Sequence, residues 1–224
     1  MRAGRRSGIW GAGGVCLLVA VSATATSASG APAPSSVSPS FAKTVVLTPV
    51  SGKVLIEVPG ARYGFVRLSN GPTVVPVGTL VDTTAGRVTL TSANPAPGGV
   101  QSGQFFEGRF QIRQPASGGG LVSLVLHDTA TRPVACEPPG AAGAAAPHAL
   151  TQRILGLLRG TAKGHFRTVG RFSAATVLGT DWGVRDRCDG TLTVVRTGVV
   201  TVRDFVRHRT VTVRTGQTYL AKAP

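Results

Sequence analysis

The stretch Val177–Asp204, VLGTDWGVRDRCDGTLTVVRTGVVTVRD, decides the fold class of this chain. Apolar and polar residues alternate through most of it, and glycines interrupt the alternation as in short strands joined by turns. A period of two places successive side chains on opposite faces of a sheet. Asp189-Gly190 and Thr197-Gly198 are the predicted hairpin turns. The stretch contains no evident catalytic motif, so it indicates architecture rather than chemistry.

The same pattern extends in both directions from that stretch, in short β-branched and alternating runs separated by Gly, Pro and Asn. The predicted strands are 44–48, 53–58, 64–68, 74–77, 80–81, 87–91, 105–114, 121–126, 165–169, 173–178, 181–185, 191–196, 199–203 and 210–214. Residues 151–159 fit one short helix as well as a strand interrupted by Gly156, and their periodicity does not decide between the two.

The segment 133–150, PVACEPPGAAGAAAPHAL, is rich in Pro, Gly and Ala and has no periodicity. We therefore predict a loop over 131–150 between two β-rich halves, 43–130 and 151–224. Regular short strands with frequent turns favour an all-β antiparallel sandwich or roll over an α/β fold.

The N-terminus has the order of a secretory signal peptide. Arg2, Arg5 and Arg6 precede an uncharged apolar run, and small residues follow it. We predict a signal peptide over 1–30 and a flexible Pro/Ser/Ala-rich leader over 31–42. No later run is long enough to span a membrane, so we expect an exported protein, extracellular or associated with the cell envelope. The sequence leaves open whether export uses the general or the twin-arginine route.

The chain has three cysteines, of which Cys16 lies in the predicted signal peptide. Cys136 and Cys188 then remain in an oxidising compartment, where two cysteines favour one disulfide over two free thiols. The chain-entropy estimate for closing so long a loop is about 4 kcal/mol.

The net charge of the chain is +15, and removing the three arginines of the signal peptide leaves +12. Such a surface can bind anionic polymers, although a solvated arginine-rich face is the plainer interpretation. Few aromatic residues accompany the arginines, so we expect no specific nucleic-acid binding. A candidate basic stripe lies on or between the last strands. Its members are Arg196, Arg203, Arg207, Arg209 and Arg214.

Alternation in the last strands also predicts which side chains face the core. The predicted core side consists of Leu192, Val194, Val200, Val202, Val211 and Val213. The predicted solvent side consists of Thr191, Thr193, Thr201, Arg203, Thr212 and Arg214.

Two groups of residues are candidates for chemistry. Asp181, Asp186 and Asp189 make a weak candidate cation site, but their spacing fits turn formation and ion pairing better than a calcium loop. His127-Asp128 could form a hydrolytic triad with a serine, but the sequence contains no Gly-x-Ser-x-Gly nucleophile elbow. We therefore predict no catalytic residues, no metal and no cofactor, and an enzyme is the least favoured alternative.

The C-terminal pattern resembles the FecR-type domain, an extracytoplasmic β domain. The resemblance rests on a strand ending in Val-x-Gly-Thr-x-aromatic, a hairpin and a closing Gly-Gln turn. The residues that carry it are Val177, Gly179, Thr180, Trp182, Thr197-Gly198 and Gly216-Gln217. It is similar in particular to exported actinobacterial proteins of FecR-like type, over most of 43–224.

The resemblance implies a non-enzymatic sensor, scaffold or binding domain at the cell envelope, with a protein or an anionic envelope polymer as partner. The anti-sigma regulation of the best-known members needs a membrane helix and a cytosolic segment, so that role is not carried over. Physically, Gly179 permits a positive φ at a strand bend, the Thr180 hydroxyl can bond locally, and Trp182 supplies core volume.

Overall fold

A computed structural model describes residues 37–129, 136 and 153–224. The predicted signal peptide over 1–30, part of the leader over 31–42 and most of the loop over 131–150 lie outside the described residues. The described part contains thirteen β-strands and one 3-10 turn, and no α-helix. The predicted all-β class is confirmed.

The element bounds follow chain order. The strands are β1 (Thr44–Glu57), β2 (Val66–Arg67), β3 (Thr73–Pro76), β4 (Leu80–Ala93), β5 (Val100–Phe106), β6 (Arg109–Arg113), β7 (Val122–His127), β8 (Ile154–Val169), β9 (Ser173–Arg187), β10 (Gly190–Thr197), β11 (Val199–Asp204), β12 (Arg209–Arg214) and β13 (Thr218–Lys222), with the 3-10 turn η1 (Ala116–Gly118) before β7.

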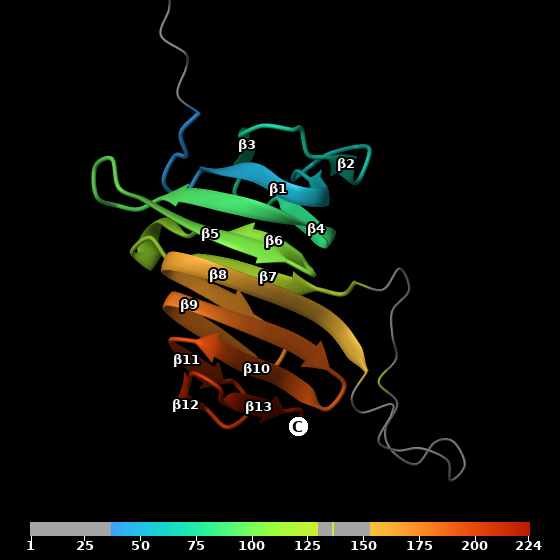
Figure 1. Ribbon diagram of the computed structural model, residues 1–224, viewed down its shortest axis with the longest axis vertical. Helices are drawn as coiled ribbons and strands as arrows, with labels where there is room; N and C mark the ends of the chain where they lie inside the picture. Colours follow the sequence, from blue (N-terminus) through green and yellow to red (C-terminus); the bar gives the residue numbers. More distant parts are fainter. Residues whose placement is uncertain (1–36, 130–135, 137–152) are drawn as a thin grey trace, which may run out of the picture. The chain divides into compact units, whose positions relative to one another are not determined.

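All thirteen strands belong to one hydrogen-bonded sheet (Figure 1). Its longest path runs β12-β11-β9-β8-β7-β6-β4-β1-β2. Every pair is antiparallel except β7 and β8, which are parallel. A parallel pair needs a long crossover connection, and the segment between β7 and β8 contains the Pro/Gly/Ala-rich loop.

Four long strands fold this sheet into two layers. The first half of β8 pairs with β5 and its second half with β7, while β9 pairs with β11 first and with β10 later. The strands β1 and β4 divide in the same way. Layer I contains β3, β5, β10 and β13 with one half of each long strand, and layer II contains β2, β6, β7, β11 and β12 with the other halves.

The sequence predicted breaks where the structure has bends. Gly164 and Gly179 lie inside β8 and β9, with φ of +125° and +83°, a region that glycine enters without steric cost. Near Gly164 the pairing register between the two strands shifts, between Ala162 and His165. Both strands therefore turn together from one layer to the other.

Residues 154–159 belong to β8, so the strand alternative for 151–159 is the correct one.

The core between the layers is centred on Phe105. Its ring centroid lies 5.8 Å from that of Phe110, 5.5 Å from that of Phe166 and 6.1 Å from that of Trp182. All four rings are fully buried, and each aromatic pair adds about 0.5–1.5 kcal/mol beyond area burial. Because these residues come from both predicted halves, the halves share one core. The Trp182 indole also donates a hydrogen bond to Thr168 Oγ1 at 3.0 Å.

The predicted faces are correct for β11 and wrong for β10. Val200 and Val202 are buried with Thr201 and Arg203 exposed, and Val213, Thr212 and Arg214 of β12 follow the prediction too. In β10, however, Thr191 and Thr193 are buried, while Leu192 and Val194 are only partly buried. The reason is register: Val195 pairs with the buried Trp182, so residues of odd number face the core.

The predicted disulfide is present. Cys136 and Cys188 are joined, with their Cα atoms 5.3 Å apart. The bond ties the turn between β9 and β10 to the segment between β7 and β8.

Within the described residues, no helix is both long and apolar enough to cross a membrane.

Candidate functional site: arginine faces and a notch above Gly183

Most carboxylates of the described residues are already used inside the molecule. Five of them form ion pairs with arginine at N–O distances of 3.4 Å or less. The pairs are Asp82–Arg109, Glu107–Arg159, Asp128–Arg171, Asp189–Arg187 and Asp204–Arg207. Since basic residues outnumber acidic ones by 24 to 9 in the chain, many arginines have no acidic partner. The positive charge available to a ligand lies on those arginines.

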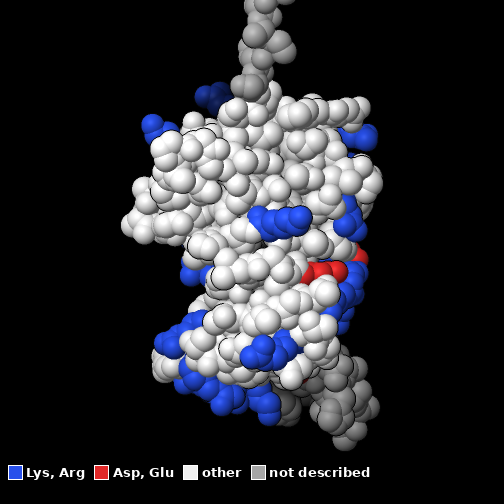
Figure 2. Space-filling view, turned by 60° about the vertical axis from the view of Figure 1, so that its left-hand side comes forward, with Lys and Arg blue, Asp and Glu red and all other residues white. Residues whose placement is uncertain are grey.

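One group of them covers the end of the sheet formed by the last strands (Figure 2). Arg203 projects from β11 and Arg214 from β12, and both side chains are exposed. Thr201, Thr210 and Thr212 are exposed beside them, and Thr201 pairs directly with Thr212. The outer side of the β11–β12 hairpin is therefore a flat face of threonine and arginine, which we call the Arg/Thr face.

The five arginines of the predicted basic stripe do not lie on one surface. Arg207 and Arg209 have structural contacts, because Arg207 binds Asp204 and the Arg209 Nε donates to the Tyr219 hydroxyl at 3.2 Å. Arg203 and Arg214 remain on the Arg/Thr face, where the Arg203 Nη1 donates a hydrogen bond to the His208 carbonyl at 3.0 Å. Arg196 lies on β10, which belongs to the other layer.

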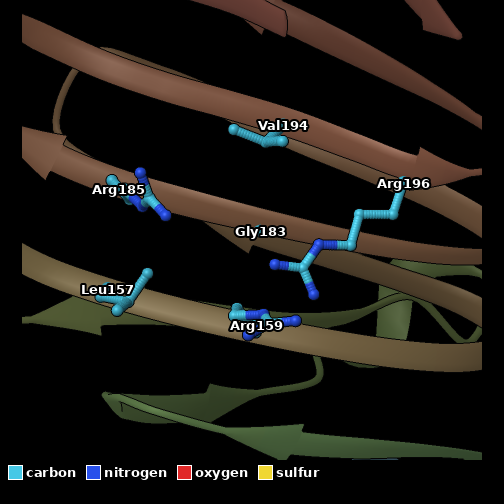
Figure 3. A pocket seen from close by; sticks show the side chains of 6 residues that line it. All are labelled: Leu157, Arg159, Gly183, Arg185, Val194 and Arg196. Carbon is cyan, nitrogen blue, oxygen red and sulfur yellow. The ribbon is translucent and has the colours of Figure 1, made fainter. Parts of the chain in front are cut away.

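Arg196 belongs to a small notch on the outer side of layer I (Figure 3). Three neighbouring strands line it: Leu157 and Arg159 come from β8, Gly183 and Arg185 from β9, and Val194 and Arg196 from β10. Gly183 pairs with Arg159 on one side and with Val194 on the other. Because Gly183 has no side chain, the sheet surface is hollow there, with arginines around the hollow.

Contacts with its neighbours hold Arg159 in position. Its Nη1 lies 2.8 Å from Glu107 Oε1, and its guanidinium carbon lies 4.9 Å from the centroid of the Phe106 ring. Arg87 covers the same ring at 3.7 Å. Phe106 thus lies between two guanidinium groups, an arrangement favoured by cation–π attraction.

Arg185 and Arg196 have no such contacts. Neither side chain forms a hydrogen bond, an ion pair or an aromatic contact with any residue that the structure describes. Figure 3 shows Arg196 extending from β10 over Gly183, toward the strand that carries Arg159. Guanidinium groups are strong donors to oxyanions, so this arrangement can bind an anionic group.

Sequence reasoning missed Arg159 and Arg185. They lie more than 20 positions apart in the chain, and only the pairing of Leu157 with Arg185 and of Arg159 with Gly183 brings them together. The available signal was the alternation of Leu157 and Arg159 in a segment whose secondary structure the sequence left open.

The three aspartates of the candidate cation site have different surroundings. Asp181 lies on β9, and its Oδ1 is buried with no hydrogen-bond partner among the described residues. Asp189 pairs with Arg187, while Asp186 is buried and accepts hydrogen bonds from the Arg171 backbone and the Thr191 hydroxyl. Burial raises the pKa of Asp186, and these hydrogen bonds offset only part of that rise. Among the described residues, no group of three or more His, Cys, Asp and Glu gathers as metal ligands would.

The two residues of the hydrolytic alternative, His127 and Asp128, have structural neighbours. Asp128 binds the Arg171 guanidinium with both carboxylate oxygens at 3.0 Å. Burial lowers the pKa of His127, and the charges of Arg109 and Arg113 lower it further.

The motif residues lie at bends, turns and in the core. Gly179 is at the bend of β9, Gly190 opens β10, and Gly198 and Gly216 lie in the connections that follow β10 and β12. The Thr180 hydroxyl is buried and has no hydrogen-bond partner among the described residues, so its predicted local bond is wrong.

Comparison with protein-family models, with curated proteins and with solved structures gave no match.

Proposed function

We propose that this chain is an exported, non-enzymatic FecR-like module that acts as a sensor, scaffold or binding domain at the cell envelope, and that it binds an anionic polymer there. The observation that carries the proposal is the pairing of charges. Five carboxylates are used in internal ion pairs, while arginines such as Arg185, Arg196 and Arg214 have side chains without described partners. A ligand with many negative charges would neutralise them.

The disulfide supports the proposed location. Disulfides persist in oxidising compartments and are rare in the cytosol, and the Cys136–Cys188 bond links segments 52 residues apart. The N-terminal signal pattern points the same way.

The distribution of the unpaired arginines favours a polymer over a small ligand. They lie on the notch of layer I and on the Arg/Thr face of layer II, so a single small anion cannot contact them all. A long polyanion can contact several at once, and each neutralised charge makes binding more sensitive to salt.

The test is retention of the purified chain on immobilised polymers. Beads carrying a phosphodiester polymer, a polyuronate and a neutral glucan are compared at increasing NaCl concentration. We expect retention on an anionic polymer that falls steeply as salt rises, and none on the glucan. Equal retention on the neutral glucan, or retention on the anionic beads that ignores salt, contradicts the proposal.

A second candidate is binding through the Arg/Thr face alone, which the exposure of Arg203 and Arg214 favours. The double variant R203Q/R214Q and the double variant R185Q/R196Q each remove two charges, one pair from each layer. The layer whose variant loses retention at the lower salt concentration carries the binding surface.

A further inference from the structure

Gly183 has no conformational reason to be glycine. Among the strand glycines of the described residues, it alone combines a φ outside the left-handed region with room for a side chain. A Cβ atom there would lie 3.4 Å from the Arg159 Cγ, an ordinary contact. At Gly160 in the next strand, by contrast, a Cβ atom would lie 2.8 Å from the Phe105 ring.

Glycine in the middle of a strand weakens it, because the unfolded chain gains entropy and no side chain packs. β9 is a central strand with partners on both sides along this region, so the loss applies at Gly183. The glycine leaves empty space on the outer face of the sheet. Gly183 forms the floor of the notch, and three arginines line its sides.

We propose that the space above Gly183 is a binding subsite for a phosphoryl group, held by the guanidinium groups of Arg159, Arg185 and Arg196. The proposal deepens the proposed function and rests on it, since the phosphoryl group would be one unit of a phosphodiester-linked polymer. Free phosphate presents the same oxygens and is the second source that the experiment separates.

The number and placement of the donors favour a phosphoryl group over a carboxylate. One guanidinium fork satisfies the two oxygens of a carboxylate. Here the three guanidinium groups come from three adjacent strands, which suits a tetrahedral anion with oxygens in several directions. Arg159 is pre-positioned by Glu107 and Phe106, so its ordering costs little entropy on binding.

The path of a longer ligand follows from the strand order. Arg87 on β4 pairs with Phe106 on β5, and Phe106 pairs with Arg159 on β8, so these residues form one row that leads to Gly183. With strands about 4.8 Å apart, Arg87 lies roughly 14 Å from the notch. A neighbouring unit of a polymer lying across the strands would meet Arg87.

The decisive variant is G183V, which fills the notch with a residue suited to strands. Titration calorimetry with a soluble phosphodiester oligomer measures the Kd, and thermal melting measures the fold. We expect G183V to raise the Kd at least tenfold while the melting temperature stays equal or rises. T161V is the matched control, because Thr161 is exposed on β8 one outward position from Arg159, and it should change neither quantity.

Charge variants test the donors. R185Q and R196Q should each weaken binding of the oligomer several-fold, whereas R67Q, at an exposed position on β2 of layer II, should leave its Kd unchanged. Inorganic phosphate should compete with the oligomer for the wild-type chain and should not bind G183V. If phosphate binds but the oligomer does not displace it, the source is free phosphate rather than a polymer.

Two results overturn the proposal. One is a G183V chain that binds the oligomer as tightly as the wild type does; salt-dependent retention of that chain on anionic beads would leave the proposed function standing. The other is a polyuronate oligomer that binds as tightly as the phosphodiester and loses as much in G183V. If instead no anionic bead retains the wild type, the polymer function fails, while phosphate binding lost in G183V still supports the notch.

Discussion

At the residue scale, Asp204 shows how a buried carboxylate holds the last strands together. Its side chain is fully buried and accepts hydrogen bonds from the Tyr219 hydroxyl at 2.6 Å and the Arg207 amide at 2.8 Å. Burial raises the pKa of Asp204, but the hydrogen bonds from Tyr219 and Arg207 outweigh burial and leave the pKa below its usual value. The ionised form is therefore the one that stabilises the fold.

We expect D204N to lower the free energy of unfolding at pH 7 by about 1.5–3 kcal/mol, the range for hydrogen bonds to a charged group. A depressed pKa in the folded state gives stability that is present above the unfolded pKa, near 3.8, and lost as the pH falls through the folded pKa. Urea unfolding at pH 7 and at pH 3 should show a smaller difference between D204N and the wild type at pH 3. A difference that is equal at both pH values would contradict the role of the ionised carboxylate.

At the element scale, alternation along a strand predicted which residues share a face better than it predicted which of the two faces is buried. It identified Val200 and Val202 as core residues, because β11 pairs regularly with β9. It failed in β10, where both the threonines and the larger aliphatic residues alternate, and only pairing with Trp182 decides which set turns inward. Glycines were equally ambiguous, since the sequence around Gly179 fits a turn between two strands as well as a bend inside one strand. The notch could not be predicted, because it depends on the register between β8, β9 and β10.

The bend in β9 makes a prediction when Gly179 is compared with Gly183 four residues later. Gly179 has space around it but a φ of +83°, so G179A should cost about 1–2 kcal/mol through backbone strain. G183A should stabilise the chain by about 0.5–1 kcal/mol, since Gly183 requires no such conformation. Chemical denaturation of the two variants, each an identical chemical change on one strand, measures the difference. Equal stabilities would show that the bend is not strained.

At the scale of the whole molecule, the disulfide and the shared core act on the same region. Cys136 belongs to the connection between the halves and Cys188 to the β9–β10 turn. The sequence was sufficient to pair them, because only Cys136 and Cys188 lie outside the predicted signal peptide. It was not sufficient to show that β8 and β9 belong to both layers, since that depends on pairings across the whole chain.

Removing the disulfide should lower the free energy of unfolding by about 4 kcal/mol, from the entropy of a loop of 52 residues in the unfolded chain. Denaturation of the C136S/C188S variant under non-reducing conditions measures the loss, and wild type treated with a reductant is the matched comparison. The β-sheet content of the variant should remain native before unfolding. A variant as stable as the oxidised wild type would show that the bond does not constrain the unfolded chain.

The long pairing of β8 with β9 has a mechanical consequence. The two strands are joined from Ile154 opposite Arg187 to Val169 opposite Ala174, and each crosses from one layer to the other. The layers are therefore joined through hydrogen-bonded strands that bend at Gly164 and Gly179, unlike two sheets connected only by loops. A force applied to either layer acts on the same paired strands, so we expect the two layers to unfold together.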